Sequence, residues 1–185
     1  MSRLPSLLLA LSLCALAPPT AAQVKSMDLP EMVSVADQAV HGRILSKRVA
    51  RIDAPDGRTL YYTTMTVEGR LLDAGTPVRV DVTFSGGFLN EEEGYWHSEA
   101  PSADDTRVGN DVVLFTKWTD GMGGALRANW IVAEHGGLFR TVDGPDGPMA
   151  LGRGQGYAIA KNVRVADLAK AVERIKIEQA QKKSR

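Results

Sequence analysis

The sequence predicts a mainly β fold: a small antiparallel open barrel or a sandwich, with a short N-terminal helix and a C-terminal amphipathic helix. Residues 78–84 alternate strictly between apolar and polar side chains, the pattern of a strand with one buried face. Turns rich in proline and glycine, such as Asp53–Gly57, separate long β-prone runs. From Val163 onward the apolar residues adopt helical spacing instead. Six or seven strands joined by such turns are typical of barrels and sandwiches.

The N-terminal elements follow from local patterns. Asp28 is suited to cap a helix that ends near Asp37, because a proline and a glutamate occupy the first turn. Residues 39–52 and 60–72 are expected to be two long strands that form an antiparallel hairpin around the turn at 53–57. The alternating strand at 78–84 then follows.

The central part of the chain contains its most apolar segment. Residues 111–118 include Val112-Val113-Leu114-Phe115, which is apolar on both faces and therefore predicts a central strand. We expect further strands at 125–133 and 137–142 and a short one at 149–151. Trp118 and Trp130 lie in or beside these strands, so we expect them in the core.

The C-terminal segment predicts a helix over about residues 163–182. Val165, Leu168, Val172 and Ile175 recur at helical spacing, so this stripe is expected to dock on the β core. Lysine and arginine side chains surround the stripe and gather near the end of the helix. An alternative is that this basic helix lies on an anionic membrane, which would make the protein a membrane-surface-associated envelope protein.

Residues 1–22 predict a cleavable secretory signal peptide. A positive charge at Arg3 precedes an apolar run from Leu4 to Ala17, and small residues follow up to Ala22. The run is short for a membrane span, and no second run of membrane length follows. The mature chain is therefore expected to be a single β-rich domain of residues 23–185, located in a bacterial periplasm or secreted.

Charge and cysteine content narrow the classes of partner and chemistry. The chain has 22 basic and 22 acidic residues, and removing Arg3 with the signal leaves 21 basic residues against 22 acidic ones. This balance gives no reason to expect nucleic acid as a partner. The single cysteine, Cys14, leaves with the signal, so no disulfide or thiolate site is expected in the mature domain. No cofactor-binding motif is present, and we predict no cofactor and no metal.

The candidate site is the long connection at residues 85–111. Loops of this length inside a domain are usually functional or disordered. Acidic side chains stand beside aromatic ones here, a combination that suits a sugar, a cation or a basic partner. The predicted ligand- or partner-binding residues are Glu91, Glu93, Tyr95, Trp96, His97, Asp104 and Asp105. The alternative is a solvated acidic loop whose aromatic side chains fold back on the barrel.

Two classes of enzyme have candidate residues in the sequence. Ser85-Gly86-Gly87 follows a strand but lacks the Gly-x-Ser-x-Gly pattern of a nucleophile elbow, so these glycines are expected to turn the chain out of the sheet. A metal-dependent hydrolase would need scattered residues, with His97, His135, Glu93 and Asp104 as candidates. No catalytic residue is predicted, and a non-catalytic role is favoured.

Three segments carry a family resemblance. Val35–Ile44, Thr63–Val67 and Val112–Phe115 resemble the first helix and strand, the hairpin and the central strand of bacterial secreted β-rich domains of unknown function. The chain is also loosely similar to netrin-like barrels of the oligonucleotide/oligosaccharide-binding (OB) type, which include the tissue inhibitors of metalloproteinases. Those inhibitors present an N-terminal cysteine to a metal, and Gln23 cannot do so. The resemblance therefore implies a fold and no inhibitory residue.

The function predicted from sequence is that of a non-catalytic secreted or periplasmic binding module. Its partner would be a protein or an envelope polymer, and self-association into a homo-oligomer is an alternative. The long connection on a rigid scaffold would carry the binding residues.

Overall fold

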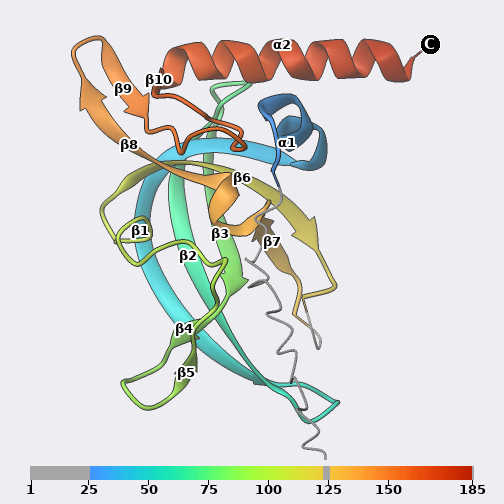
Figure 1. Cartoon of the computed structure of the whole chain (residues 1–185). Helices are drawn as coiled ribbons and strands as arrows, with labels where there is room; N and C mark the ends of the chain where they lie inside the picture. The colour runs from blue at the N-terminus through green and yellow to red at the C-terminus, as the bar shows by residue number, and fades with distance from the viewer. Residues whose placement is uncertain (1–25, 123–125, 185) are drawn as a thin grey trace, which may run out of the picture.

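Five strands close into a barrel in the computed structural model, which describes residues 26–122 and 126–184 (Figure 1). The predicted signal peptide at 1–22 lies outside the described residues. The barrel strands are β1 (Gln38–Asp53), β2 (Thr59–Leu71), β3 (Pro77–Ser85), β6 (Asp111–Thr119) and β7 (Ala128–Ile131). They follow each other around the barrel in the order β1-β2-β3-β7-β6, and β6 pairs back with β1. The predicted small β barrel is confirmed, and its sheet closes on itself.

The barrel closes through one short parallel contact. Strands β3 and β7 pair at Val82 with Asn129 and at Thr83 with Trp130, and these strands run parallel. The other barrel pairings are antiparallel, as the sequence predicts. The parallel pair was not expected, because β7 returns beside β3 only after the chain has crossed the barrel through β6.

Strand β1 serves two regions of the sheet. Residues 38–43 pair with β6 and belong to the barrel, whereas the rest of β1 pairs with β2 alone as a long ribbon. The register shifts between Ile44 and Ser46, which marks a bulge at the transition. Because a bulge bends its strand and increases the local twist, the ribbon leaves the barrel at an angle.

Strand β6 separates two hydrophobic cores. Val112 and Leu114 pack inside the barrel, and Val113 and Phe115 pack on its outer face beneath the helices; all four side chains are fully buried. This confirms the central strand that the run at 112–115 predicts. Full burial of one such side chain is worth about 1.5–3 kcal/mol, so β6 stabilises both layers.

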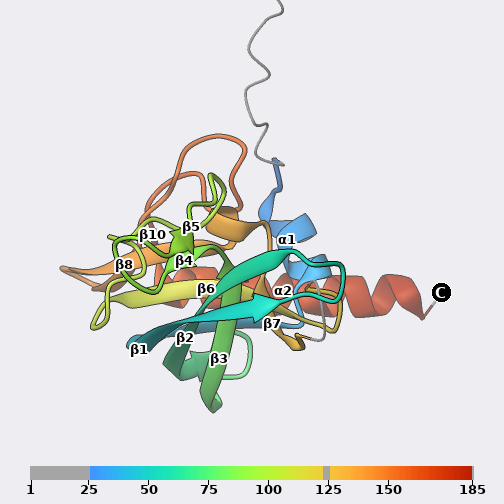
Figure 2. The same cartoon turned by 90° about the horizontal axis from the view of Figure 1, so that it is seen from below.

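Two helices cover the outer core. Helix α1 (Leu29–Val35) begins as predicted, because the Asp28 carboxylate accepts a hydrogen bond from the Glu31 N–H at 2.8 Å. Helix α2 (Val165–Lys183) buries the predicted stripe of Val165, Leu168, Val172 and Ile175. Figures 1 and 2 show α2 crossing one end of the barrel and extending beyond it. None of the helices in the described residues is long and apolar enough to cross a membrane.

The remaining elements extend the sheet and connect its strands. Strands β8 (Leu138–Gly144), β9 (Gly147–Ala150) and β10 (Val163–Arg164) continue from β6 toward α2. The predicted strands at 137–142 and 149–151 thus correspond to β8 and β9. The predicted strand at 125–133 is shorter as β7, and residue 125 lies outside the described residues. A 3-10 helix, η1 (Glu134–Gly137), joins β7 to β8.

Candidate functional site

The connection between β3 and β6 leaves the sheet at two glycines. Gly86 and Gly87 have φ of +90° and +133°, values that favour glycine. A Cβ atom at Gly87 would also collide with the hydroxyl of Thr63. That hydroxyl donates a hydrogen bond to the Gly86 carbonyl at 2.7 Å. The chain therefore turns tightly over the β1–β2 ribbon, as the glycines predict.

A small hairpin follows and forms hydrogen bonds with the ribbon. Strands β4 (Gly87–Phe88) and β5 (Gly94–Tyr95) enclose a turn in which Asn90 accepts hydrogen bonds from two backbone N–H groups. One carboxylate oxygen of Glu93 accepts from Arg51 at 2.9 Å and from the Tyr61 hydroxyl at 3.3 Å. The hairpin thus lies over the ribbon, away from α2 (Figure 1).

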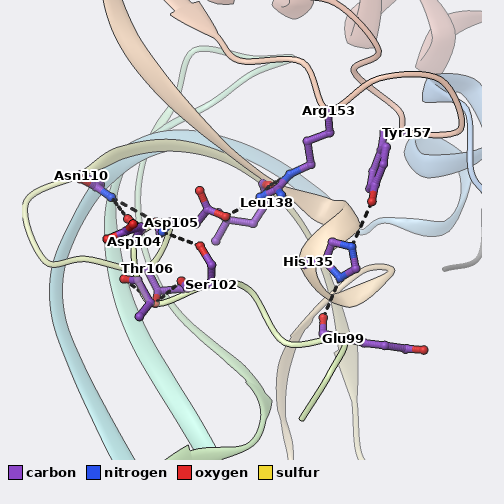
Figure 3. A network of polar contacts seen from close by, with 11 residues as sticks. Glu99, Ser102, Asp104, Asp105, Thr106, Asn110, His135, Leu138, Arg153 and Tyr157 are labelled. Carbon is purple, nitrogen blue, oxygen red and sulfur yellow. Dashed lines mark hydrogen bonds and ion pairs between the residues drawn. The ribbon is translucent and has the colours of Figure 1, made fainter. Parts of the chain in front are cut away.

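The second half of the connection packs against the barrel. Ala100 contacts the inner core, and Thr106 is almost fully buried. The Asn110 side chain donates to the Asp104 carbonyl at 2.7 Å (Figure 3). Asp105 forms an ion pair with Arg153 at 2.8 Å, and both side chains are less than a quarter exposed. The predicted candidate Asp105 is therefore held in a structural contact.

A groove lies between the ribbon, the hairpin and this packed segment. Its volume is about 550 Å³, and its lining includes Lys47, Val49, Thr63 and His97. Phe88, Tyr95 and Trp96 also line it, and their side chains are 54%, 55% and 71% exposed. The structure thus brings the predicted residues Tyr95, Trp96 and His97 together on one groove, and the aromatic side chains do not fold back into the barrel.

The predicted acidic residues lie elsewhere. Glu91 is exposed at the hairpin turn, and Glu93 is bonded to Arg51. Asp104 pairs with Arg107 at 2.6 Å on the surface. No Asp or Glu is among the described residues that line the groove. The described groove lining therefore carries the positive charge of Lys47 and no acidic side chain, although the segment that forms its walls is acidic.

Three groove-lining residues are not among those predicted from the sequence: Lys47, Val49 and Phe88. Phe88 could have been noticed, because an apolar pair at 88–89 inside a polar connection is unusual. Lys47 and Val49 belong to a strand that precedes the connection by more than thirty residues in the printed sequence. No local pattern indicates that they face it.

A polar cluster joins the groove wall to η1. The Glu99 carbonyl accepts hydrogen bonds from the His135 N–H at 3.0 Å and from its Nδ1 at 2.9 Å. Because a carbonyl only accepts, the Nδ1 atom carries a proton, and Nε2 lies within hydrogen-bond distance of the Tyr157 hydroxyl, at 3.2 Å (Figure 3). His135 is therefore engaged on both ring nitrogens.

Glu134, the neighbour of His135 in this cluster, combines a strained backbone with a buried carboxyl oxygen. Ala133 and Glu134 have φ of +54° and +52°, a left-handed conformation that is strained for residues with a Cβ atom. The Oε2 atom of Glu134 is buried and has no hydrogen-bond partner. Burial, reinforced by the nearby Glu99 carboxylate, raises the pKa of Glu134 to about 8. Glu134 is thus a carboxyl group that is neutral in the folded protein at neutral pH.

The described part of the chain contains no metal centre of the kind that the alternative of a metal-dependent hydrolase needs. Residues 26–122 and 126–184 contain no group of three or more His, Cys, Asp or Glu that could hold a metal ion. Of its candidates, His135 is hydrogen-bonded within the protein, and Glu93 and Asp104 pair with arginines.

Two tryptophans depart from the prediction. Trp118 is 55% exposed and Trp130 is half-buried, so the expectation that both pack in the core is wrong. They lie where β6 and β7 extend past the buried part of the barrel, and with Met27 and Met122 they line a second cavity of about 520 Å³. The strand continues there beyond the layer that could cover it.

Comparison with protein-family models, curated proteins and solved structures finds no match to this chain.

Proposed function

We propose that this chain is a non-catalytic binding module of the bacterial periplasm or exterior, released by cleavage of residues 1–22. Its groove holds a protein segment or an envelope polymer. The observation that carries this proposal is the gathering of Phe88, Tyr95 and Trp96 as exposed side chains along a groove of about 550 Å³. Exposed aromatic side chains beside a concave surface are typical of binding sites, because they bury large area at low cost in side-chain entropy.

The surroundings of the groove support binding by a preformed surface. Hydrogen bonds from Arg51 and Tyr61 to the Glu93 carboxylate fix the hairpin in place. The ion pair of Asp105 with Arg153 fixes the opposite wall. A site whose walls are fixed in this way loses little entropy when it takes up a ligand.

The test is retention of envelope components on the immobilised mature chain, Gln23 to Arg185. The material applied is an envelope extract of the source cells, divided into a protein and a polysaccharide fraction. Trp96→Ala should reduce retention at least tenfold without changing the thermal midpoint, because this side chain is largely exposed.

Trp118→Ala is the matched control, since Trp118 is an exposed tryptophan outside the groove lining. Equal retention by Trp96→Ala and the unaltered protein would contradict the proposal. N-terminal sequencing of the purified protein checks the signal peptide, and the expected first residue is Gln23. Deletion of the whole segment 91–105 is a poor substitute, because it would also remove Asp105 and its ion pair.

A further inference from the structure

Strand β1 has an open edge beside the groove. Its partner β6 pairs with residues 38–43, and the chain at Gly109 and Asn110 then covers Ile44 through backbone hydrogen bonds of 2.8 and 2.9 Å. Beyond the bulge, the β1 pairings are those with β2 on its other edge. In the described residues, no backbone hydrogen bond between 46 and 53 reaches this outer edge.

The register identifies which backbone groups are free. The Gly86 N–H donates to the Tyr61 carbonyl at 2.8 Å, so the backbone of Tyr61 faces away from β1. Tyr61 lies opposite Arg51, which makes them a non-hydrogen-bonded pair. By alternation, Lys47, Val49 and Arg51 direct their N–H and C=O groups outward. Arg48 and Ala50 use theirs toward β2.

The free edge belongs to the groove already described. Lys47 and Val49 are both groove-lining residues, and Arg51 carries the hairpin contact at Glu93. A strand placed along this edge would therefore find backbone partners on one side. Its alternate side chains would reach the aromatic groups of the groove.

Charge indicates the kind of strand that fits. In the described residues, the groove lining contains Lys47 and no carboxylate, and the Lys47 Nζ atom makes a 3.4 Å contact to the neutral hydroxyl of Thr106. An acidic side chain on the incoming strand would complement this ammonium group. A second copy of this chain fits poorly, because antiparallel pairing centred on Val49 would set Lys47 opposite Arg51, and like charges in that position are destabilising.

We propose that the groove binds an extended acidic peptide segment, which adds as a strand to the β1 edge at Lys47, Val49 and Arg51. Main-chain hydrogen bonds supply affinity, and Trp96 with its neighbours receives an apolar side chain. This inference rests on the proposed function and names the partner for the same groove.

The first experiment measures fluorescence anisotropy of a labelled nine-residue peptide that alternates valine or phenylalanine with aspartate. A lysine-for-aspartate analogue and a neutral hexasaccharide of N-acetylglucosamine are compared with it on the mature chain. The acidic peptide should bind at least tenfold more tightly than the basic one. Lys47→Gln should weaken binding of the acidic peptide by about threefold to tenfold, less so at high salt.

The second experiment tests the backbone contact without altering the protein. Two further peptides carry N-methyl groups on alternate residues, one set on odd and one on even positions. Only one set can face β1, so one peptide should lose at least tenfold in affinity while the other keeps it. In the bound state, amide hydrogen exchange should slow at Lys47, Val49 and Arg51 and stay unchanged at Arg48 and Ala50.

The outcomes separate the two proposals. Equal affinity for both N-methylated peptides, or unchanged exchange at the three outward amides, overturns the strand addition. Binding of the hexasaccharide but not of the peptides, with loss in Trp96→Ala, overturns the peptide occupant and leaves the groove as a binding site. If Trp96→Ala still retains envelope components, the proposed function and this inference fail together.

Discussion

Replacing Glu134 by glutamine should stabilise the protein by an amount that grows with pH. The Glu134 carboxyl has a buried oxygen without a partner, and its pKa is raised to about 8 from an ordinary value of 4.5. Between these two pH values the folded protein holds a proton that the unfolded chain has released. The free energy of unfolding therefore falls as pH rises through this window.

The magnitude follows from the same two values. At about 1.4 kcal/mol for each tenfold change in proton affinity, the interval from 4.5 to about 8 corresponds to about 5 kcal/mol before solvent screening is taken into account. Glu134 is only partly buried, so solvent screening reduces the expected cost to about 2 kcal/mol. Glu134→Gln removes the charge and keeps the shape. It should be near neutral at pH 4.5 and more stable than the unaltered protein by about 2 kcal/mol above pH 8.

Urea unfolding of the mature chain at pH 4.5, 6, 7 and 9 measures this difference. Glu91→Gln is the matched control, because Glu91 is exposed at the hairpin turn and its substitution should have the same small effect at every pH. A stability difference between Glu134→Gln and the unaltered protein that stays constant with pH would contradict a raised pKa at Glu134.

Three further substitutions test the contacts that shape the groove and the fold. Asp105→Asn should lower the free energy of unfolding by about 1–3 kcal/mol, because it leaves the partly buried Arg153 without its anion. The double variant Asp105→Asn with Arg153→Met should regain part of this loss, and a double-mutant cycle measures how much. Gly87→Ala should lower the free energy of unfolding by more than about 2 kcal/mol in the same urea assay. Gly57 also has a positive φ, but open space surrounds it, so Gly57→Ala should lower the free energy by only about 1 kcal/mol. Asp28→Ala should cost about 1 kcal/mol by removing the cap of α1, and an unchanged midpoint would contradict that role.

The regular elements could be predicted because their causes are local. The run at 112–115 needs apolar cover on both faces, and β6 has a core on each side. The stripe that begins at Val165 needs one buried face, and α2 buries it. Asp28 needs only the N–H groups of the next turn.

The exposed tryptophans and the barrel closure could not be predicted in this way. Trp118 and Trp130 have the composition of core residues, but burial depends on whether another layer reaches the end of their strands. The parallel contact of β3 with β7 depends on the path of the whole chain and leaves no mark on either strand.

Pattern and composition predict a β-rich chain with a helical C-terminal segment, in which aromatic and acidic residues occur together at 85–111. Which of those residues share a surface depends on how the whole chain folds. Asp105 meets Arg153 and Glu93 meets Arg51, so these carboxylates are used in ion pairs. The aromatic side chains are left on a groove with Lys47. The attraction between two opposite charges depends on their distance in space, and the spacing of residues along the chain does not determine that distance.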